Sequence, residues 1–268
     1  YDLDHTALLI SQTGGGGRAS NYIKLLRKAL VKAGYEKIPV ASLNFSGLEK
    51  GSGIPLSLHL LRKLVAAIFY GDLLCALRSQ TVPYEDHAGD ADAAAERWLG
   101  VIGGWMRDNR YFSASGMKKQ FPAITADFAR IPVTRTARIR VGVVGEIYVK
   151  YSPLGNNDLV RFLESQGCEV NLPGLMGFIE YCVANTTITQ ELYGGNPLMA
   201  KGADAFLGWL DGIGNAMNDA LRRDGFYAPG SFRELMKKPD GIISLGAKMG
   251  EGWLLTAEMI ELVQGGYG

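Results

Sequence analysis

The chain has 268 residues, 47% of them hydrophobic and 21% charged, and its 28 basic and 27 acidic side chains give a net charge of +1. This composition allows a sizeable core, which we expect in two lobes, and the nearly balanced charge argues against nucleic acid or a membrane surface as a partner. Three scattered cysteines form no disulfide framework, and the apolar run from Leu64 to Tyr70 is too short to cross a bilayer, so the sequence predicts a cytoplasmic setting.

The first predicted unit is a strand, a helix and a second strand. An apolar strand near 6–11 ends at consecutive glycines, and apolar residues at helical spacing predict a helix near 20–33. Gly34 should end that helix, and 38–43 has the pattern of the next strand. Strands joined through a helix pair in parallel, so we expect a short parallel sheet here.

Helical periodicity dominates the next segment, about 55–128. Helices are predicted over 55–78, over 90–107 and over 117–128, and Pro122 should limit the length of the last one. We interpret this segment as a helical insertion within the first lobe.

A second strand–helix–strand unit begins at Arg138. The predicted strand at 138–145 leads into a polar loop from Glu146 to Asn157, then a helix over 158–166 ended by Gly167, and a strand over 168–172. Helices over 175–185 and 201–223, a short strand over 242–245 and a helix over 252–263 follow. The sequence therefore predicts an α/β fold with two lobes, 1–136 and 137–268, each with a short, mainly parallel sheet flanked by helices. Because the chain begins at Tyr1 and ends directly after a helix, we expect it to be part of a longer protein.

The first candidate binding site is the glycine-rich loop between the first strand and the first helix. Bare backbone N–H groups and the positive end of the helix dipole favour an anion there, and an arginine adds a cationic fork. Its spacing matches neither the dinucleotide fingerprint nor the Walker loop, so a purely conformational role for the glycines is equally open. The candidate cofactor-binding residues of this loop are Gly14, Gly15, Gly16, Gly17, Arg18, Ser20 and Asn21.

Two further candidates follow later in the chain. The loop after the third strand is dense in hydrogen-bonding groups, although an N-cap at Asn157 or Asp158 would explain part of its polarity. The turn Gly250-Glu251-Gly252-Trp253 could contribute Glu251, or could be a glycine turn with Trp253 packed in the core. The candidate binding residues of these segments are Glu146, Tyr148, Lys150, Asn156, Asn157 and Glu251.

Other chemistry-bearing residues give no motif. The three histidines share no metal-ligand spacing, and Cys75 and Cys182 fall in apolar helical segments, where we expect them to be core thiols. No G-x-S-x-G elbow is present, so a serine hydrolase is disfavoured. The sequence predicts no metal site and identifies no catalytic residue.

Several runs together resemble a known family. The chain is similar to the dehydratase-subunit-like module of the large CoA-substrate-specific enzyme activases, which are related to 2-hydroxyacyl-CoA dehydratases and their activators. The similarity extends in patches over nearly the whole chain, and the run from Glu146 to Pro153 is its most specific part. The runs that carry it are 12–22 (Gln-Thr-Gly-Gly-Gly-Gly-Arg-Ala-Ser-Asn-Tyr), 70–74 (Tyr-Gly-Asp-Leu-Leu), 83–85 (Pro-Tyr-Glu), 144–153 (Val-Gly-Glu-Ile-Tyr-Val-Lys-Tyr-Ser-Pro) and 250–255 (Gly-Glu-Gly-Trp-Leu-Leu).

The resemblance implies a role in ATP-driven transfer of single electrons at very low potential, through iron–sulfur clusters held by cysteine. It implies partner domains in the same polypeptide, namely ATP-binding activator domains of the acetate-kinase and actin-like class. In that family a cysteine usually stands where this chain has Gly17, and further cysteines are expected beyond Gly268. We therefore expect no complete iron–sulfur cluster in these 268 residues alone.

A different class of function remains open from the residues themselves. The chain could be a non-catalytic α/β module that binds a phosphate-bearing ligand or supports neighbouring domains. Under either hypothesis we expect the loops 12–21 and 146–157 to lie at the carboxyl ends of strands and to face a common cleft between the lobes.

Overall fold

A computed structural model describes residues 2–12, 21–44 and 57–268, so the loops at 13–20 and 45–56 lie outside the described residues. The structure is mostly helical (63%) and contains two short parallel sheets of two strands each, which makes it a mixed α/β fold. The chain divides into two compact units, Tyr1–Leu60 and Leu61–Gly268. None of the described helices combines the length and the apolar character needed to cross a membrane.

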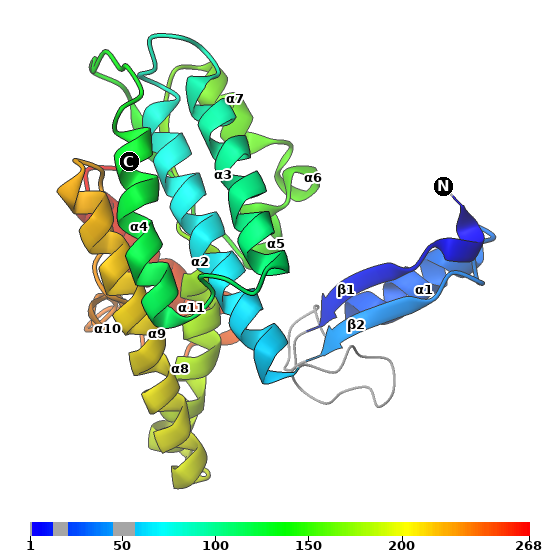
Figure 1. The fold of residues 1–268 in the computed structure, drawn as a ribbon. Helices are drawn as coiled ribbons and strands as arrows, with labels where there is room; N and C mark the ends of the chain where they lie inside the picture. The colour runs from blue at the N-terminus through cyan, green and yellow to red at the C-terminus, as the bar shows by residue number, and fades with distance from the viewer. Residues whose placement is uncertain (1, 13–20, 45–56) are drawn as a thin grey trace. The chain divides into compact units, whose positions relative to one another are not determined.

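The first unit contains the predicted strand–helix–strand motif (Figure 1). Strands β1 and β2 pair in parallel from Leu8 opposite Val40 to Gln12 opposite Asn44. Gly34 follows the helix with a positive φ of 78°, a conformation in which an L side chain is strained, and thereby reverses the chain toward β2. The elements of this unit are η1 (Leu3–His5), β1 (Leu8–Gln12), α1 (Tyr22–Lys32) and β2 (Val40–Asn44).

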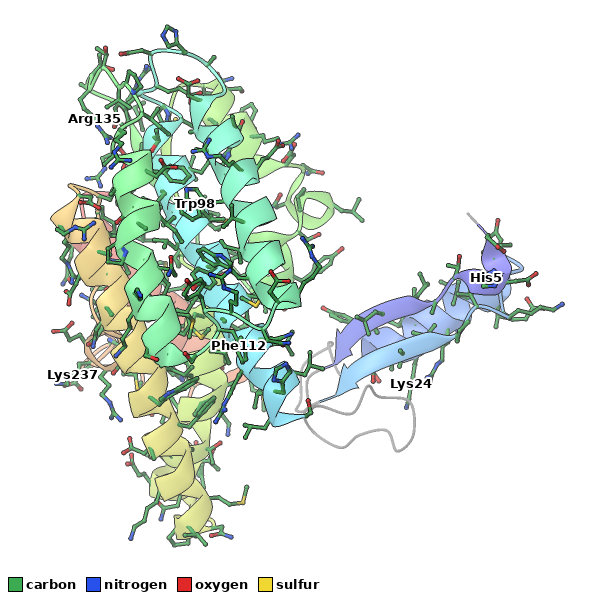
Figure 2. The ribbon with its side chains drawn as sticks, viewed as in Figure 1. His5, Lys24, Trp98, Phe112, Arg135 and Lys237 are labelled. Atoms are coloured by element: carbon green, nitrogen blue, oxygen red, sulfur yellow. The ribbon has the colours of Figure 1, made fainter. Side chains whose placement is uncertain are left out.

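The second unit is built from long helices around a small sheet (Figure 1). Helix α2 begins in the last residues of the first unit and continues as the central helix of the second. Trp98 on α3 reaches the neighbouring α4, where its Nε1 donates to Asp127 Oδ2 at 2.9 Å (Figure 2). The elements in chain order are α2 (Leu58–Thr81), α3 (Asp90–Arg107), α4 (Ala114–Phe128), β3 (Arg140–Gly142), α5 (Ile147–Tyr151), α6 (Pro153–Asn156), α7 (Leu159–Ser165), β4 (Glu169–Asn171), α8 (Leu175–Tyr193), α9 (Pro197–Arg223), α10 (Phe232–Leu235), η3 (Met249–Glu251) and α11 (Gly252–Gln264).

Helix α4 is longer than the sequence predicts. It begins at Ala114, where the Ser113 side chain caps Gly116 N, and it continues through Pro122 to Phe128. Proline removes a backbone donor in mid-helix, but the helical residues on either side of it, Phe121 and Ile124, are completely buried. Their packing outweighs the local penalty, so the expected limit at Pro122 was wrong.

The strand predicted over 242–245 was also wrong. Ile242 N and Ile243 N both donate to Pro239 O, at 2.9 and 3.0 Å, which closes the chain into turns. Ile243 and Leu245 pack as single side chains against a cluster around the fully buried Trp253. Ile242 is 68% exposed, so a short apolar run can contribute single side chains to a core without forming a strand.

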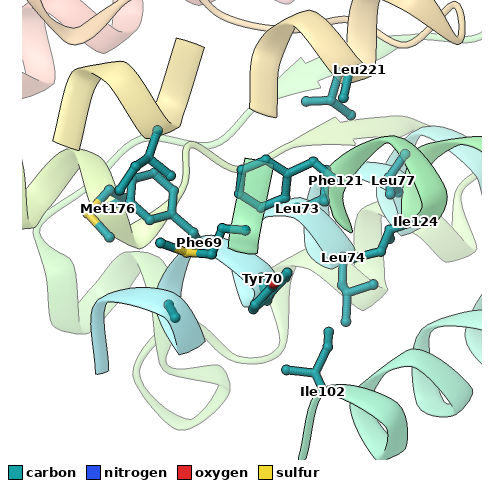
Figure 3. Packing of buried hydrophobic residues seen from close by; sticks show 14 of the residues in the cluster. Phe69, Tyr70, Leu73, Leu74, Leu77, Ile102, Phe121, Ile124, Met176 and Leu221 are labelled. Carbon is teal, nitrogen blue, oxygen red and sulfur yellow. The ribbon is translucent and has the colours of Figure 1, made fainter. Parts of the chain in front are cut away.

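The main hydrophobic core joins helices that are far apart in the sequence (Figure 3). Phe69, Tyr70 and Leu73 of α2 pack among residues of α3, α4, α8 and α9, and the Tyr70 and Phe121 rings meet edge-on at 5.7 Å. The predicted helical insertion thus shares its core with α8 and α9. The boundary between the compact units, at 60/61, consequently differs from the predicted lobe boundary at 136/137.

The second sheet, formed by β3 and β4, leads into the candidate site. β3 and β4 pair in parallel, Arg140 opposite Glu169, and the Glu169 carboxylate accepts from the hydroxyls of Tyr84 and Tyr267, both at 2.6 Å. Arg140 Nε donates to the same carboxylate at 3.2 Å. The segment from Glu146 follows the carboxyl end of β3, where we expected it.

Candidate functional site

The centre of the candidate site is a buried ion pair between α5 and α11. Lys150 Nζ lies 2.8 Å from Glu258 Oε1 and 3.0 Å from Oε2, and both side chains are only 3% exposed. Burial raises the pKa of the Glu258 carboxyl, and the Lys150 ammonium opposes that rise. A pair so removed from water contributes to stability only while both charges are present.

Glu251 lies beside this pair in a strained backbone conformation. Its φ is +57°, unusual for a residue other than glycine, and it precedes the first residue of α11. The side chain is 9% exposed, and Oε2 has no hydrogen-bond partner in the described part of the chain. Burial and the nearby Glu146 raise the pKa of Glu251, while Lys150 and the Ile147 backbone N–H lower it.

Asp72 connects α2 to the beginning of α8. Its carboxylate accepts from Leu175 N at 2.9 Å and Met176 N at 2.8 Å, so it caps two backbone donors at the positive end of a 19-residue helix. Burial nevertheless raises the pKa of Asp72 to about 6, with the two backbone bonds and Lys150 acting in the opposite direction. The neighbouring Tyr151 hydroxyl donates to Pro173 O at 2.6 Å.

Glu180 is the second carboxyl with a strongly shifted pKa. It lies on α8, is 7% exposed, and has a pKa raised to about 8 by burial, by Asp211 and by Asp72. We call Asp72, Lys150, Glu180, Glu251 and Glu258 the buried ionic cluster. With four carboxyl groups and one ammonium, it can hold protons near neutral pH, and such shifted groups are enriched at functional sites.

The Asp72 carboxylate that caps the first residues of α8, which we call the latch, can be tested directly because Gly174 lies close to Asp72. A Cβ at position 174 would lie 2.6 Å from Asp72 Oδ2, whereas a Cβ at Gly177, also near the start of α8, would meet nothing within 4 Å. We expect Gly174→Ala to lower the free energy of unfolding by about 1–3 kcal/mol through this overpacking. Urea denaturation checks this. Gly177→Ala is the control and should be neutral or stabilising, and an equal effect of the two variants would contradict the latch.

The loop predicted at 146–157 consists of two short helices, α5 and α6. Asn156 holds them together, because its Nδ2 donates to Val149 O at 2.8 Å and its Oδ1 accepts from Leu159 N at 3.2 Å. Asn157 and Asp158 both have φ of 56°, and Asp158 makes no capping bond with its side chain at the start of α7, so the expected ordinary N-cap was wrong.

The remaining predicted residues of this segment lie nearer the surface. Glu146 caps α5 by accepting from Tyr148 N at 3.0 Å, and Tyr148 is 47% exposed. A Cβ at Gly155 would come 2.9 Å from the Tyr148 ring, so this glycine permits a close contact. Of the predicted residues, Lys150 and Glu251 therefore enter the buried ionic cluster, and Glu146 acts on Glu251 electrostatically.

Most of the candidate residues of the glycine loop lie at 13–20, outside the described residues. These six residues are Gly14, Gly15, Gly16, Gly17, Arg18 and Ser20. The expected cleft shared with 146–157 involves these residues and stays a prediction. Asn21 is exposed at the start of α1, and its side chain makes no capping hydrogen bond.

Three members of the cluster were not predicted as site residues. Asp72 lies in one of the runs that carry the family resemblance, and Glu180 and Glu258 are carboxylates flanked by apolar residues within helices. An ionisable residue on an apolar helix face needs a buried partner, which is the signal that could have found them.

The cysteines lie on separate parts of the second unit. Cys168 is buried, but Cys75 and Cys182 are exposed, so the expectation that these two are core thiols was wrong. Within residues 2–12, 21–44 and 57–268, no three histidine, cysteine or acidic side chains are grouped to hold a metal ion.

Comparison with protein-family profiles, with curated proteins and with solved structures finds no match to this chain.

Proposed function

We propose that this chain is a module of an iron–sulfur, ATP-driven, low-potential electron-transfer protein related to 2-hydroxyacyl-CoA dehydratases and their activators. Its partners would be the ATP-binding activator domains of the same polypeptide, in a cytoplasmic setting. We further propose that the two parallel strand–helix–strand units are related lobes of this module.

One observation supports this proposal above the others. Three of the runs that carry the family resemblance meet at the buried ionic cluster: the run at 70–74 provides Asp72, the run at 144–153 provides Lys150, and the run at 250–255 provides Glu251. These runs are far apart in the sequence. Their meeting at one group of charged side chains is the behaviour of a site rather than of unrelated matches.

The residues of this chain do not fit a four-cysteine cluster. The sequence contains only Cys75, Cys168 and Cys182, and the described residues bring no group of metal ligands together. In the proposed function, cluster ligands therefore come from other parts of the protein. This chain would then be one part of the electron-transfer protein, with its cluster incomplete within these 268 residues.

The function is tested in a longer protein that contains these residues and the ATP-binding domains. After anaerobic purification and mixing with a strong reductant, MgATP should produce the electron paramagnetic resonance signal of a reduced cluster, and a non-hydrolysable ATP analogue should not. A protein without iron would overturn the proposal, as would a signal that is independent of ATP. Binding of a phosphate-bearing ligand by such an iron-free protein would favour the alternative of a non-catalytic binding module.

Iron content gives a second test, centred on Gly17. We expect little cluster absorbance when the 268-residue chain is reconstituted anaerobically with iron and sulfide. In a longer chain with downstream cysteines, Gly17→Cys should raise bound iron, because the surrounding N–H groups would lower the thiol pKa and bond to cluster sulfurs.

The matched control for this substitution is Gly15→Cys in the same loop, which should bind no additional iron. Stoichiometric iron and sulfide on the unmodified 268 residues would show that the ligands are Cys75, Cys168 or Cys182. Unchanged iron in the longer Gly17→Cys chain would show that the glycine loop has a conformational role only.

A further inference from the structure

A pocket of about 390 Å³ lies on the second unit, along α8 and beside the start of α9. Its volume is at the lower end of the range found for small-molecule sites. No member of the buried ionic cluster lines it, although Glu251 is near enough to act on the lining residue Cys182. Nine residues line it, among them Cys182, Asn185, Thr189 and Lys248.

The lining is rich in hydrogen-bond donors and contains a single charge. Lys248 contributes an ammonium group, and within the described part of the chain its Nζ donates one side-chain hydrogen bond, to Thr189 Oγ1 at 2.7 Å. The Oδ1 of Asn185 accepts from Trp253 Nε1 at 3.3 Å, and its amide also hydrogen-bonds the Tyr181 hydroxyl, so one N–H of this side chain remains for a ligand. None of the nine lining residues is acidic.

The thiol in the lining adds no negative charge. The protein packed around the thiol and the nearby Glu251 raise the pKa of Cys182 to about 11, although the side chain keeps access to solvent, so the thiol is neutral at physiological pH. Glu251 itself does not line the pocket. One ammonium among amides, hydroxyls and a neutral thiol is complementary to an anionic group that accepts several hydrogen bonds.

We propose that this pocket binds a small polar molecule through an oxyanion, a carboxylate or a phosphate, paired with Lys248. The volume exceeds what a lone oxyanion fills, so the rest of the ligand is a polar body that contacts the amide and hydroxyl side chains of α8. This site is independent of the proposed iron–sulfur function.

Cysteine labelling tests the proposal with an internal control. Cys182 lines the pocket and Cys75 does not, and both are exposed. The rate at which a maleimide alkylates each thiol is measured by peptide mass spectrometry, with the protein in millimolar phosphate or succinate. The rate in chloride at equal ionic strength is the baseline. We expect one of the two anions to slow labelling of Cys182 saturably, by about fivefold or more at high occupancy, and to leave Cys75 unchanged.

Three variants separate binding at Lys248 from other effects. Lys248→Met should abolish the protection of Cys182, and Lys248→Arg should retain it because the charge remains. Lys201 is an exposed lysine of α9 outside the lining, so Lys201→Met should not alter the protection. Protection by phosphate identifies a phosphate-bearing ligand, and protection by succinate identifies a carboxylate. The proposal is overturned if neither anion protects Cys182, if protection persists in Lys248→Met, or if Cys75 is slowed equally.

Discussion

Replacement of Lys150 by methionine should be among the most destabilising single changes in this chain. The variant leaves the Glu258 carboxylate buried without its partner, and such a loss lowers the free energy of unfolding by about 3–5 kcal/mol. Because Glu258 can take up a proton once the ammonium is gone, the loss should become smaller as the pH falls. Urea denaturation at several pH values measures both effects.

The double variant Lys150→Met/Glu258→Met removes both charges and should recover at least about half of the loss, since an apolar pair of similar volume replaces a buried ionic one. Lys237→Met, at an exposed lysine, is the control and should change stability by less than about 0.5 kcal/mol (Figure 2). A single variant as stable as this control would show that the ion pair carries no structural role.

Glu180→Gln should stabilise the protein in alkaline solution. In the folded chain the pKa of Glu180 is raised to about 8 from the ordinary value of 4.5, so the folded state holds a proton that the unfolded state has released. The native protein therefore loses stability as the pH rises from about 4.5 to about 8. A glutamine has no proton to lose. The free energy of unfolding of the variant should therefore exceed that of the native protein by an amount that grows across that window, to on the order of 3 kcal/mol at about pH 9.

The measurement is the difference in unfolding free energy between variant and native protein at each pH. Glu191→Gln provides the control, because Glu191 is an exposed carboxyl on the same helix. A difference for Glu180→Gln that stays constant from acidic to alkaline pH would show that this carboxyl is not protonated in the folded state.

Local patterns in the sequence predicted most helices and both parallel strand pairs. The helix over 90–107 was predicted with its observed bounds, and Gly34 and Gly167 end helices as expected, since periodicity and glycine stops act between near neighbours. The turn at 242–245 was mistaken for a strand because two of its apolar residues, Ile243 and Leu245, are partly buried against distant side chains, while Ile242 is exposed. Local pattern does not distinguish these two ways of burying an isoleucine.

The candidate site was predicted less completely, for a related reason. Lys150 was predicted as a polar residue of a loop, yet its partner Glu258 is 108 positions away, and only the tertiary fold buries them together. Glu180 was missed because the sequence alone does not show which face of its helix is buried, and Glu191 of the same helix is exposed. Asp72 lay in a run that carried the resemblance, but its role as a cap of α8 depends on a contact across 103 positions.

The composition of the main core has a consequence for the order in which it can assemble. Helices α2, α3 and α4 follow one another in the chain, so their mutual contacts close short loops, whereas Leu210 and Ile213 of α9 must reach the same core from a distant part of the sequence. The entropy lost on closing a loop grows with its length, and contacts distant in sequence form later on average. We therefore expect the three consecutive helices to associate first and α9 to complete the core late, so substitutions at Leu210 should act mainly on the rate of unfolding.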